Sequence, residues 1–222
     1  MRGDAKTLRP SGHLLVFGLV LLAGPALGVE EAWTVESGRT VGTGTTVFWG
    51  QVGYPGIWAE LIHGLDPTTE LGGKLAFNYG PEGLVDSCCS AELGFQFLLR
   101  KSLFDNGKIV IAGVFDPGFL LFFPSGYAQF GLTFPVGVEF GFPVNARVSL
   151  NASFDLPMYV TFSADNHGGQ FALPILFGGG VEYLMERSLA LTFKLKLGPT
   201  IFTGGGSAQF TLYALFGAAY KF

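Results

Sequence analysis

Charge is scarce in this sequence. Only 14% of the 222 residues are charged, with 13 Lys and Arg against 17 Asp and Glu, whereas an average globular chain carries about 25% charge. An acidic chain with so few basic residues offers no basic stripe that could neutralise phosphates. Nucleic acid is therefore not expected as a partner.

Cysteine is also nearly absent. The two cysteines, Cys88 and Cys89, are adjacent, so they cannot link distant segments and do not form a disulfide framework. A disulfide between the two neighbours and a pair of free thiols both remain open. Neither a metal site nor a bound cofactor is expected, because the sequence shows no set of ligands that would hold one.

Apolar residues and glycine are abundant. Hydrophobic residues make up 49% of the chain, which has 34 Gly and 23 Phe, and the mean hydropathy is +0.42. So much apolar surface excludes a disordered chain. The glycines keep no three-residue period, which excludes a collagen-like chain. The composition is that of one very apolar domain.

The first 28 residues have the features of a secretory signal peptide. Three basic residues lie in the first nine positions, an apolar run covers 14–22, and Ala26-Leu27-Gly28 offers a cleavage site. The apolar run is too short to cross a bilayer as a helix, which needs about 20 residues. We expect export of the chain with cleavage before Val29; an uncleaved N-terminal anchor is the alternative.

The hydrophobic pattern of the remaining chain has a period of two. Uncharged stretches at 117–138 and 197–220 contain prolines or a Gly204-Gly205-Gly206 run, which disfavour helices. Read as strands, the sequence alternates large apolar residues with small or polar ones. In 188–198 the two faces are Leu189, Leu191, Phe193, Leu195 and Leu197 against Ala190, Thr192, Lys194 and Lys196.

The composition of the second face of these strands distinguishes a membrane barrel from a soluble sandwich. A soluble sheet carries many charges on its outer face, but here that face is mostly Gly, Ser, Thr, Ala and Asn. Strands of about 10–14 residues also exceed the usual 5–6 and suit a tilted crossing of a bilayer. Because lipid offers no partners to backbone groups, such strands must close into a barrel. The sequence predicts an all-β, transmembrane, antiparallel up-and-down β-barrel.

The number of strands is expected to be ten, with eight or twelve as alternatives. The predicted strands are 41–52, 55–64, 70–80, 90–102, 107–118, 126–141, 146–161, 171–184, 188–202 and 208–222. Tight connections at 66–69, 105–107, 143–145 and 186–188 alternate with longer ones, including 117–126, as in outer-membrane barrels with short periplasmic turns. The predicted organisation is a signal peptide at 1–28, a short periplasmic lead-in at 29–40 and a barrel at 41–222.

The C-terminus carries a second signal. The chain ends in Ala219-Tyr220-Lys221-Phe222, an aromatic-x-aromatic terminus on the apolar face of the last predicted strand. This resembles the C-terminal signal by which bacterial outer-membrane β-barrel proteins are recognised by their assembly machinery. The resemblance implies a bacterial outer-membrane location, with Tyr220 and Phe222 as the insertion signal and membrane lipid and the assembly machinery as partners.

Charged residues on the predicted inner faces are the candidate functional residues. They are Glu60, Lys74, Glu92, Arg100, Glu139, Arg147, Asp155, Glu182, Lys194, Lys196 and Lys221. Both signs occur in near balance. The set could be a mutually neutralising network that makes the interior rigid, or it could line a path for small ions or solutes.

The sequence favours a non-enzymatic role, either a narrow pore or a structural or surface-interacting barrel. One alternative is an outer-membrane hydrolase of lipid or peptide that uses His167, which follows Asp165 in a predicted external loop. His63, the other histidine after the signal peptide, adjoins a tight turn and is expected to have no catalytic role. Another alternative is a soluble secreted barrel that binds an apolar ligand.

Overall fold

The computed structural model of the chain describes residues 33–79, 91–123, 128–162, 169–203 and 208–222. The chain divides into two units, 1–30 and 31–222, and all described residues belong to the second. The predicted signal peptide, Cys88 and Cys89, and His167 lie outside the described residues.

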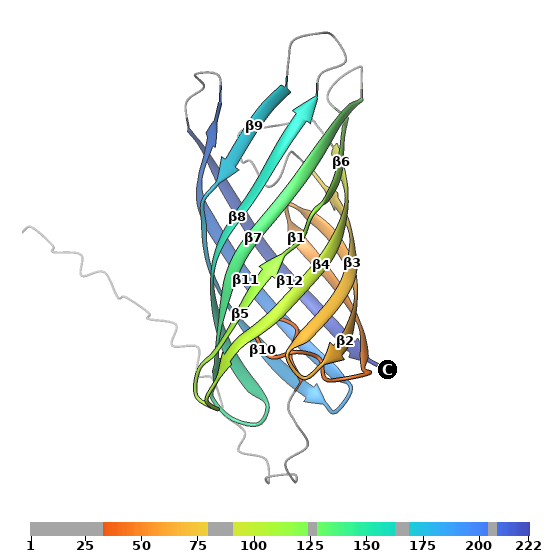
Figure 1. The fold of residues 1–222 in the computed structure, drawn as a ribbon, viewed down its shortest axis with the longest axis vertical. Helices are drawn as coiled ribbons and strands as arrows, with labels where there is room; N and C mark the ends of the chain where they lie inside the picture. Colours follow the sequence, from red (N-terminus) through yellow and green to blue (C-terminus); the bar gives the residue numbers. More distant parts are fainter. Residues whose placement is uncertain (1–32, 80–90, 124–127, 163–168, 204–207) are drawn as a thin grey trace, which may run out of the picture. The chain divides into compact units, whose positions relative to one another are not determined.

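The described residues form twelve β-strands (Figure 1). These are β1 (Thr46–Tyr54), β2 (Gly56–Asp66), β3 (Thr69–Asn78), β4 (Ala91–Asp105), β5 (Val110–Phe115), β6 (Gly118–Phe123), β7 (Gln129–Pro143), β8 (Val148–Phe162), β9 (Gly169–Pro174), β10 (Leu176–Glu186), β11 (Leu189–Phe202) and β12 (Gln209–Lys221). Among these residues no helix is both long and apolar enough to cross a membrane.

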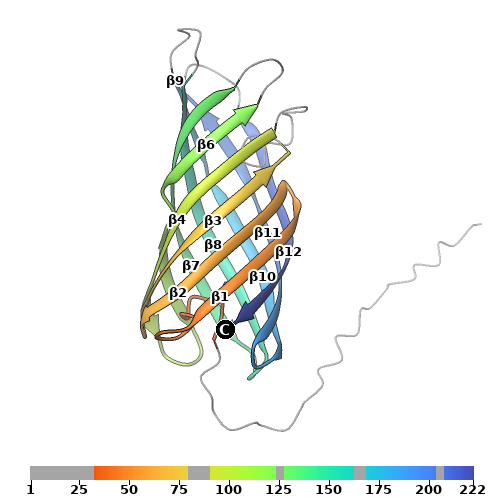
Figure 2. The same ribbon diagram turned by 90° about the vertical axis from the view of Figure 1, so that its right-hand side faces the viewer.

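The strands close into an antiparallel barrel. All of the pairings between strands are antiparallel, and β1 pairs with β12 from Val47 opposite Lys221 to Tyr54 opposite Ala214. Strands β5 and β6 share one place in the wall, because both pair with β4 and β7. Strands β9 and β10 likewise share the place between β8 and β11. The described wall therefore has ten strand positions, as predicted (Figures 1 and 2).

The prediction was wrong about the second half of the fifth wall position. It ended that strand at 118 and placed an external connection at 117–126, but β6 continues the wall to Phe123. Pro117 has no N–H and interrupts the ladder, yet the backbone stays in register. The Phe97 N–H donates to the Pro117 carbonyl (2.9 Å) and the Asp116 N–H to the Pro135 carbonyl (3.0 Å).

Four tight turns lie where the sequence places them, and polar side chains hold three of them. Asp66 accepts hydrogen bonds from the Thr68 N–H (2.7 Å) and hydroxyl (2.8 Å). Asn106 accepts from the Lys108 and Ile109 N–H groups, and Asn145 accepts from those of Arg147 and Val148. Short Asx side chains stabilise turns in this way. These turns and the C-terminus lie at one end of the barrel (Figure 2).

The two faces of the wall differ as the period of two predicts. Large apolar side chains point outward and remain exposed in every quarter of the barrel; they include Phe48, Ile57, Phe97, Phe119, Phe134, Phe177, Leu195 and Phe216. Neighbouring strands bring outer rings into contact, as with Phe193 and Phe216 at 4.7 Å between centroids. Ala190, Thr192 and Lys194 on the opposite face of β11 are buried. The hydrophobic surface of this fold therefore lies outside.

The residues before β1 fold back into the barrel. We call residues 33–41 the inner segment. All of its residues except Arg39 are buried, and Trp33, Val35 and Val41 pack with Val47, Trp49 and Ile62 of the wall. The sequence predicted a periplasmic lead-in at 29–40, whereas residues 33–40 lie inside the end of the barrel that carries the tight turns (Figures 1 and 2).

Candidate functional site

The barrel interior contains nearly all of the charged residues that the sequence placed there. Glu60, Glu92, Arg100, Glu182 and Lys194 are each at most 9% exposed. Lys74, Glu139, Asp155 and Lys196 line a central cavity. Lys221 lies at one end, with its Nζ 5.9 Å from the centre of the Trp33 ring.

Arg147 is the exception. It was expected on an inner face, but it is exposed in the turn between β7 and β8. The Asn145 side chain accepts hydrogen bonds from the Arg147 and Val148 N–H groups and so extends the turn. Strand β8 begins at Val148, later than the predicted start at 146. Arg147 is therefore not a lumen charge.

Backbone groups of the inner segment are bound by acidic side chains of the wall. Glu182 of β10 accepts from the Val35 N–H (3.1 and 3.2 Å to its two oxygens) and from the Glu36 N–H (3.2 Å). Glu70 of β3 accepts from the Val41 N–H (2.9 Å). Hydrogen bonds to a carboxylate are stronger than neutral ones. Opposite sides of the wall thus hold the segment in place.

Arg100 of β4 joins the inner segment to the wall. Its guanidinium pairs with Glu70 and with Glu139, the latter at 3.2 Å. It also donates to the carbonyl oxygens of Val35 and, at 3.4 Å, Thr34. A planar guanidinium with five N–H donors suits such a shared position.

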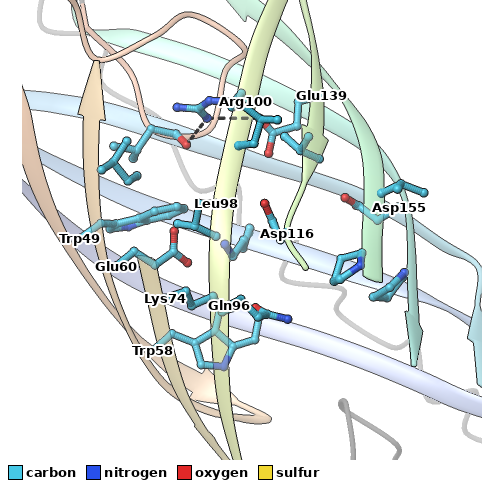
Figure 3. Close-up of a pocket in the computed structure, with 18 of the residues that line it drawn as sticks. Trp49, Trp58, Glu60, Lys74, Gln96, Leu98, Arg100, Asp116, Glu139 and Asp155 are labelled. Atoms are coloured by element: carbon cyan, nitrogen blue, oxygen red, sulfur yellow. Dashed lines mark hydrogen bonds and ion pairs between the residues drawn. The ribbon is translucent and has the colours of Figure 1, made fainter. Parts of the chain in front are cut away.

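A cavity of about 130 Å³, lined by both charged and apolar side chains, lies next to this network (Figure 3). Trp49 of β1 and Trp58 of β2 form one side, and Asp116 and Asp155 lie across from them. The Lys196 Nζ is 2.9 Å from the Asp155 carboxylate. Charges of both signs therefore face one small space.

Lysine side chains also lie over the tryptophan rings of this cavity. The Lys74 Nζ is 3.6 Å from the centre of the Trp58 ring. The Lys194 Nζ lies between both rings, 4.3 Å from Trp49 and 5.1 Å from Trp58. Such cation–π contacts stabilise desolvated ammonium groups. They allow the interior to hold lysines beside apolar rings.

The opposite half of the barrel interior is packed as well. Leu120, Phe122, Tyr159 and Ala172 form a buried cluster there. Between this cluster and the cavity, the Trp58 Nε1 donates to the Asn78 Oδ1, and the Asn78 Nδ2 donates to the Glu92 Oε1, both at 2.8 Å. Side chains thus fill much of the described lumen, as expected for a barrel of about this size.

Three interior acids were missed by the sequence analysis. Glu70 shares the alternation of its strand with the predicted inward residue Lys74, so the period of two could have identified it. Asp116 follows the buried Val110 and Ala112 at two-residue spacing, but apolar residues on both faces of that predicted strand hide the period. Glu36 could not be found that way, because it precedes the first strand. In the structure it lies 3.3 Å from the Lys194 Nζ and accepts from the Asn151 side chain.

The described residues show no arrangement of side chains that supports the catalytic alternative. His63 is exposed and shares a 2.9 Å hydrogen bond with the Thr46 hydroxyl, and His167 lies outside the described residues. Within the described ranges, no three or more His, Cys, Asp or Glu side chains gather so that they could hold a metal ion.

The C-terminal aromatic residues lie on the outer face. Tyr220 and Phe222 are exposed, and their rings meet edge to face at 5.2 Å between centroids. The Phe222 N–H donates to the Thr46 carbonyl, which fixes the chain end against β1.

Comparisons with known proteins reach only the level of architecture. No protein-family model matches the chain, and no curated protein sequence matches it. Among solved structures, the outer membrane protease OmpT from Escherichia coli matches with a TM-score of 0.44 and 8% identity, over 81% of this chain and 94% of that one. The KdgM porin matches with a TM-score of 0.35 and 10% identity, over 80% of this chain and 99% of that one. One neighbour is thus a protease and the other a porin.

Proposed function

We propose that this protein is a bacterial outer-membrane barrel with a non-enzymatic, structural or surface-interacting role, and that its lumen is not an open pore. The inner segment carries this proposal. It occupies one end of the barrel, where buried charged residues from several strands bind it.

The outer face supports a membrane location. Strands β4, β7 and β8 each have 15 residues, more than the 9–11 that cross a bilayer at a tilt. Their outward side chains are largely apolar and exposed. The closed ladder pairs most backbone groups within the wall, as a lipid environment requires.

The tight turns support one orientation. Outer-membrane barrels have short turns on the periplasmic side and longer loops outside. In that orientation the inner segment enters from the periplasm, and the C-terminal Tyr220 and Phe222 lie at the periplasmic rim. Membrane lipid and the assembly machinery are the proposed partners.

Interior packing favours a closed barrel over a narrow pore. The inner segment closes off one end, and the cluster around Leu120 and Tyr159 packs the other half. Arg100, Lys194 and Lys196 pair with interior carboxylates, which fits a structural charge network more closely than an ion path.

Planar-bilayer recording of the refolded full-length chain tests this proposal. Insertion is first verified by a heat-dependent shift in migration on a semi-denaturing gel. We expect no channel events across the voltage range. Steady conductance from the inserted, unmodified protein would contradict the closed lumen, and extraction of the cellular protein into buffer without detergent would contradict the membrane location.

A further inference from the structure

Five prolines lie at one level of the wall, in five consecutive strand positions. They are Pro117, Pro135, Pro157, Pro174 and Pro199. Pro135 is directly opposite Pro157 in the register of β7 and β8. Proline cannot donate to a ladder and is normally excluded from the middle of a sheet. A row of five weakens the wall at that level.

The wall is weakest between β8 and the shared position of β9 and β10. Strand β8 pairs with β10 up to Asp155 opposite Leu176, and with β9 from Tyr159 opposite Ala172. The three residues 156–158 belong to neither ladder. The same register places Pro157 opposite Pro174, and neither residue has an N–H to donate.

This gap borders the central cavity. Asp155 and Pro157, on one side of it, and Leu176, on the other, all line the cavity. The Lys196–Asp155 ion pair lies beside it. Irregular backbone at membrane depth is tolerated where it is buried in protein or lines a water-filled cavity. At this gap, only the weakened wall therefore lies between the charged residues of the interior and the apolar outer face.

The outer face has an apolar groove at the same level. Phe177, Leu197, Pro199 and Phe210 line it, where β10, β11 and β12 lie side by side. The groove is continuous with the exposed apolar surface that we assign to lipid. A hydrocarbon chain is the occupant that suits it.

We infer that the gap between β8 and β9/β10 is a lateral entrance, through which a single-chain amphiphile from the membrane places its head group in the central cavity. The acyl chain remains in the apolar groove outside. This inference rests on the proposed membrane location. It gives the barrel a ligand site that is reached through the side of the wall, although the lumen is not an open pore.

The cavity defines the head group. A cavity of about 150 Å³ holds benzene, so the 130 Å³ here admits a group of similar size. The cations around it already have carboxylate neighbours: Lys196 has Asp155, Lys194 has Glu36, and Lys74 lies opposite Glu60 in the ladder. Carboxylates outnumber cations in the lining by five to four, which disfavours an anionic head group. The matching head group is therefore compact and polar and carries no negative charge, as in a monoacylglycerol.

Native tryptophan fluorescence provides the test. Trp49 and Trp58 line the cavity, and the third tryptophan, Trp33, is removed by Trp33→Phe. The protein is refolded into vesicles, and a monoacylglycerol brominated at carbon 2 of its acyl chain is added as the quencher. We expect quenching by this probe and none by 2-bromohexadecanoate, whose head group is a carboxylate.

Restoring the missing donors should close the entrance. The double variant Pro157→Ala and Pro174→Ala supplies two N–H groups to the gap, and we expect it to lose the quenching. Pro143→Ala, a proline change at the end of β7, is the matched control and should be quenched like the parent. A folded double variant that is quenched as strongly as the parent would overturn the inference.

A reversible lock gives a second, independent measurement. Met158 and Leu173 are replaced by cysteines, and Cys88 and Cys89 are changed to Ser. Met158 and Leu173 are the next opposite pair after Tyr159 and Ala172 in the register of β8 and β9. Quenching should disappear on oxidation and return on reduction. A control pair at Leu195 and Ala214, opposite each other in β11 and β12, should show no redox effect. Quenching that persists in the oxidised gap variant contradicts the entrance.

The remaining outcomes are also decisive. An inserted, heat-shifting parent that no monoacylglycerol quenches overturns the lateral site and leaves the membrane location standing. Equal quenching by the carboxylate probe overturns the assignment of a head group without negative charge. A chain that does not insert into vesicles overturns both the site and the proposed function.

Discussion

Lys194 of β11 and Glu36 of the inner segment form an ion pair inside the barrel, with 3.3 Å between Nζ and Oε1. The same lysine lies over the rings of Trp49 and Trp58. The inner segment is therefore connected directly to the central cavity. Changes that displace the segment should alter the properties of the whole interior.

Gly141→Ala should displace the inner segment. A Cβ at this position would overlap the backbone carbonyl of Ser37, and backbone atoms cannot move aside as a flexible side chain can. We expect channel events in planar bilayers that the parent lacks. Gly179→Ala is the control, because its Cβ would meet only the Asn151 carbonyl at an ordinary 3.6 Å. Identical silence of both variants would show that the segment does not close the lumen.

Arg100→Met should strongly destabilise the barrel. Arg100 is 6% exposed and pairs with Glu70 and Glu139, so its loss leaves buried carboxylates without their cation. Breaking a buried pair in this way lowers the free energy of unfolding by about 3–5 kcal/mol. Denaturant titration of the folded protein in micelles measures the change. Arg147→Met, at an exposed turn, should stay within about 0.5 kcal/mol of the parent, and equal losses in the two variants would contradict the role of Arg100.

The sequence predicted the wall because strands with an apolar outer face and a polar or small inner face obey a simple rule. Leu189 to Leu197 alternate without exception, and three of the four tight turns contain Asp or Asn at the required positions. The fifth strand was misjudged because Pro117 is an ordinary signal for the end of a strand. The pairing of β6 with both β4 and β7 overrides that local signal. Such pairing between distant segments cannot be seen in the local sequence.

The interior was predictable only in part. Inward residues of regular strands, such as Glu182 and Lys194, follow from the period of two. The inner segment has no periodicity, and its position depends on contacts with residues more than a hundred positions away, such as Val35 with Glu182. Glu36 therefore resembled a solvated charge in the sequence, although it is buried.

Glu182→Ala should loosen the inner segment without opening the wall. Glu182 accepts the N–H groups of Val35 and Glu36, and without it these donors lose their partners. We expect faster hydrogen–deuterium exchange across residues 33–41, since exchange reports local opening, while exchange in β4 and β8 stays slow. Glu186→Ala, at the exposed end of β10, should leave the segment protected. Unchanged exchange in the Glu182 variant would mean that other contacts suffice to hold it.

Phe222→Ala should slow insertion of the barrel by the cellular assembly machinery. Phe222 and Tyr220 are exposed on the outer face of the last strand and contact each other, so they are available to a receptor before the strand closes against β1. We expect accumulation of the unfolded form, which does not shift on heating, in cells that express the variant. Phe216→Ala removes another exposed ring, from within β12, and controls for lost apolar surface. Because refolding into detergent needs no receptor, the two variants should refold at similar rates in vitro. A Phe222 variant that assembles in cells as fast as the Phe216 control would remove the insertion signal from this chain.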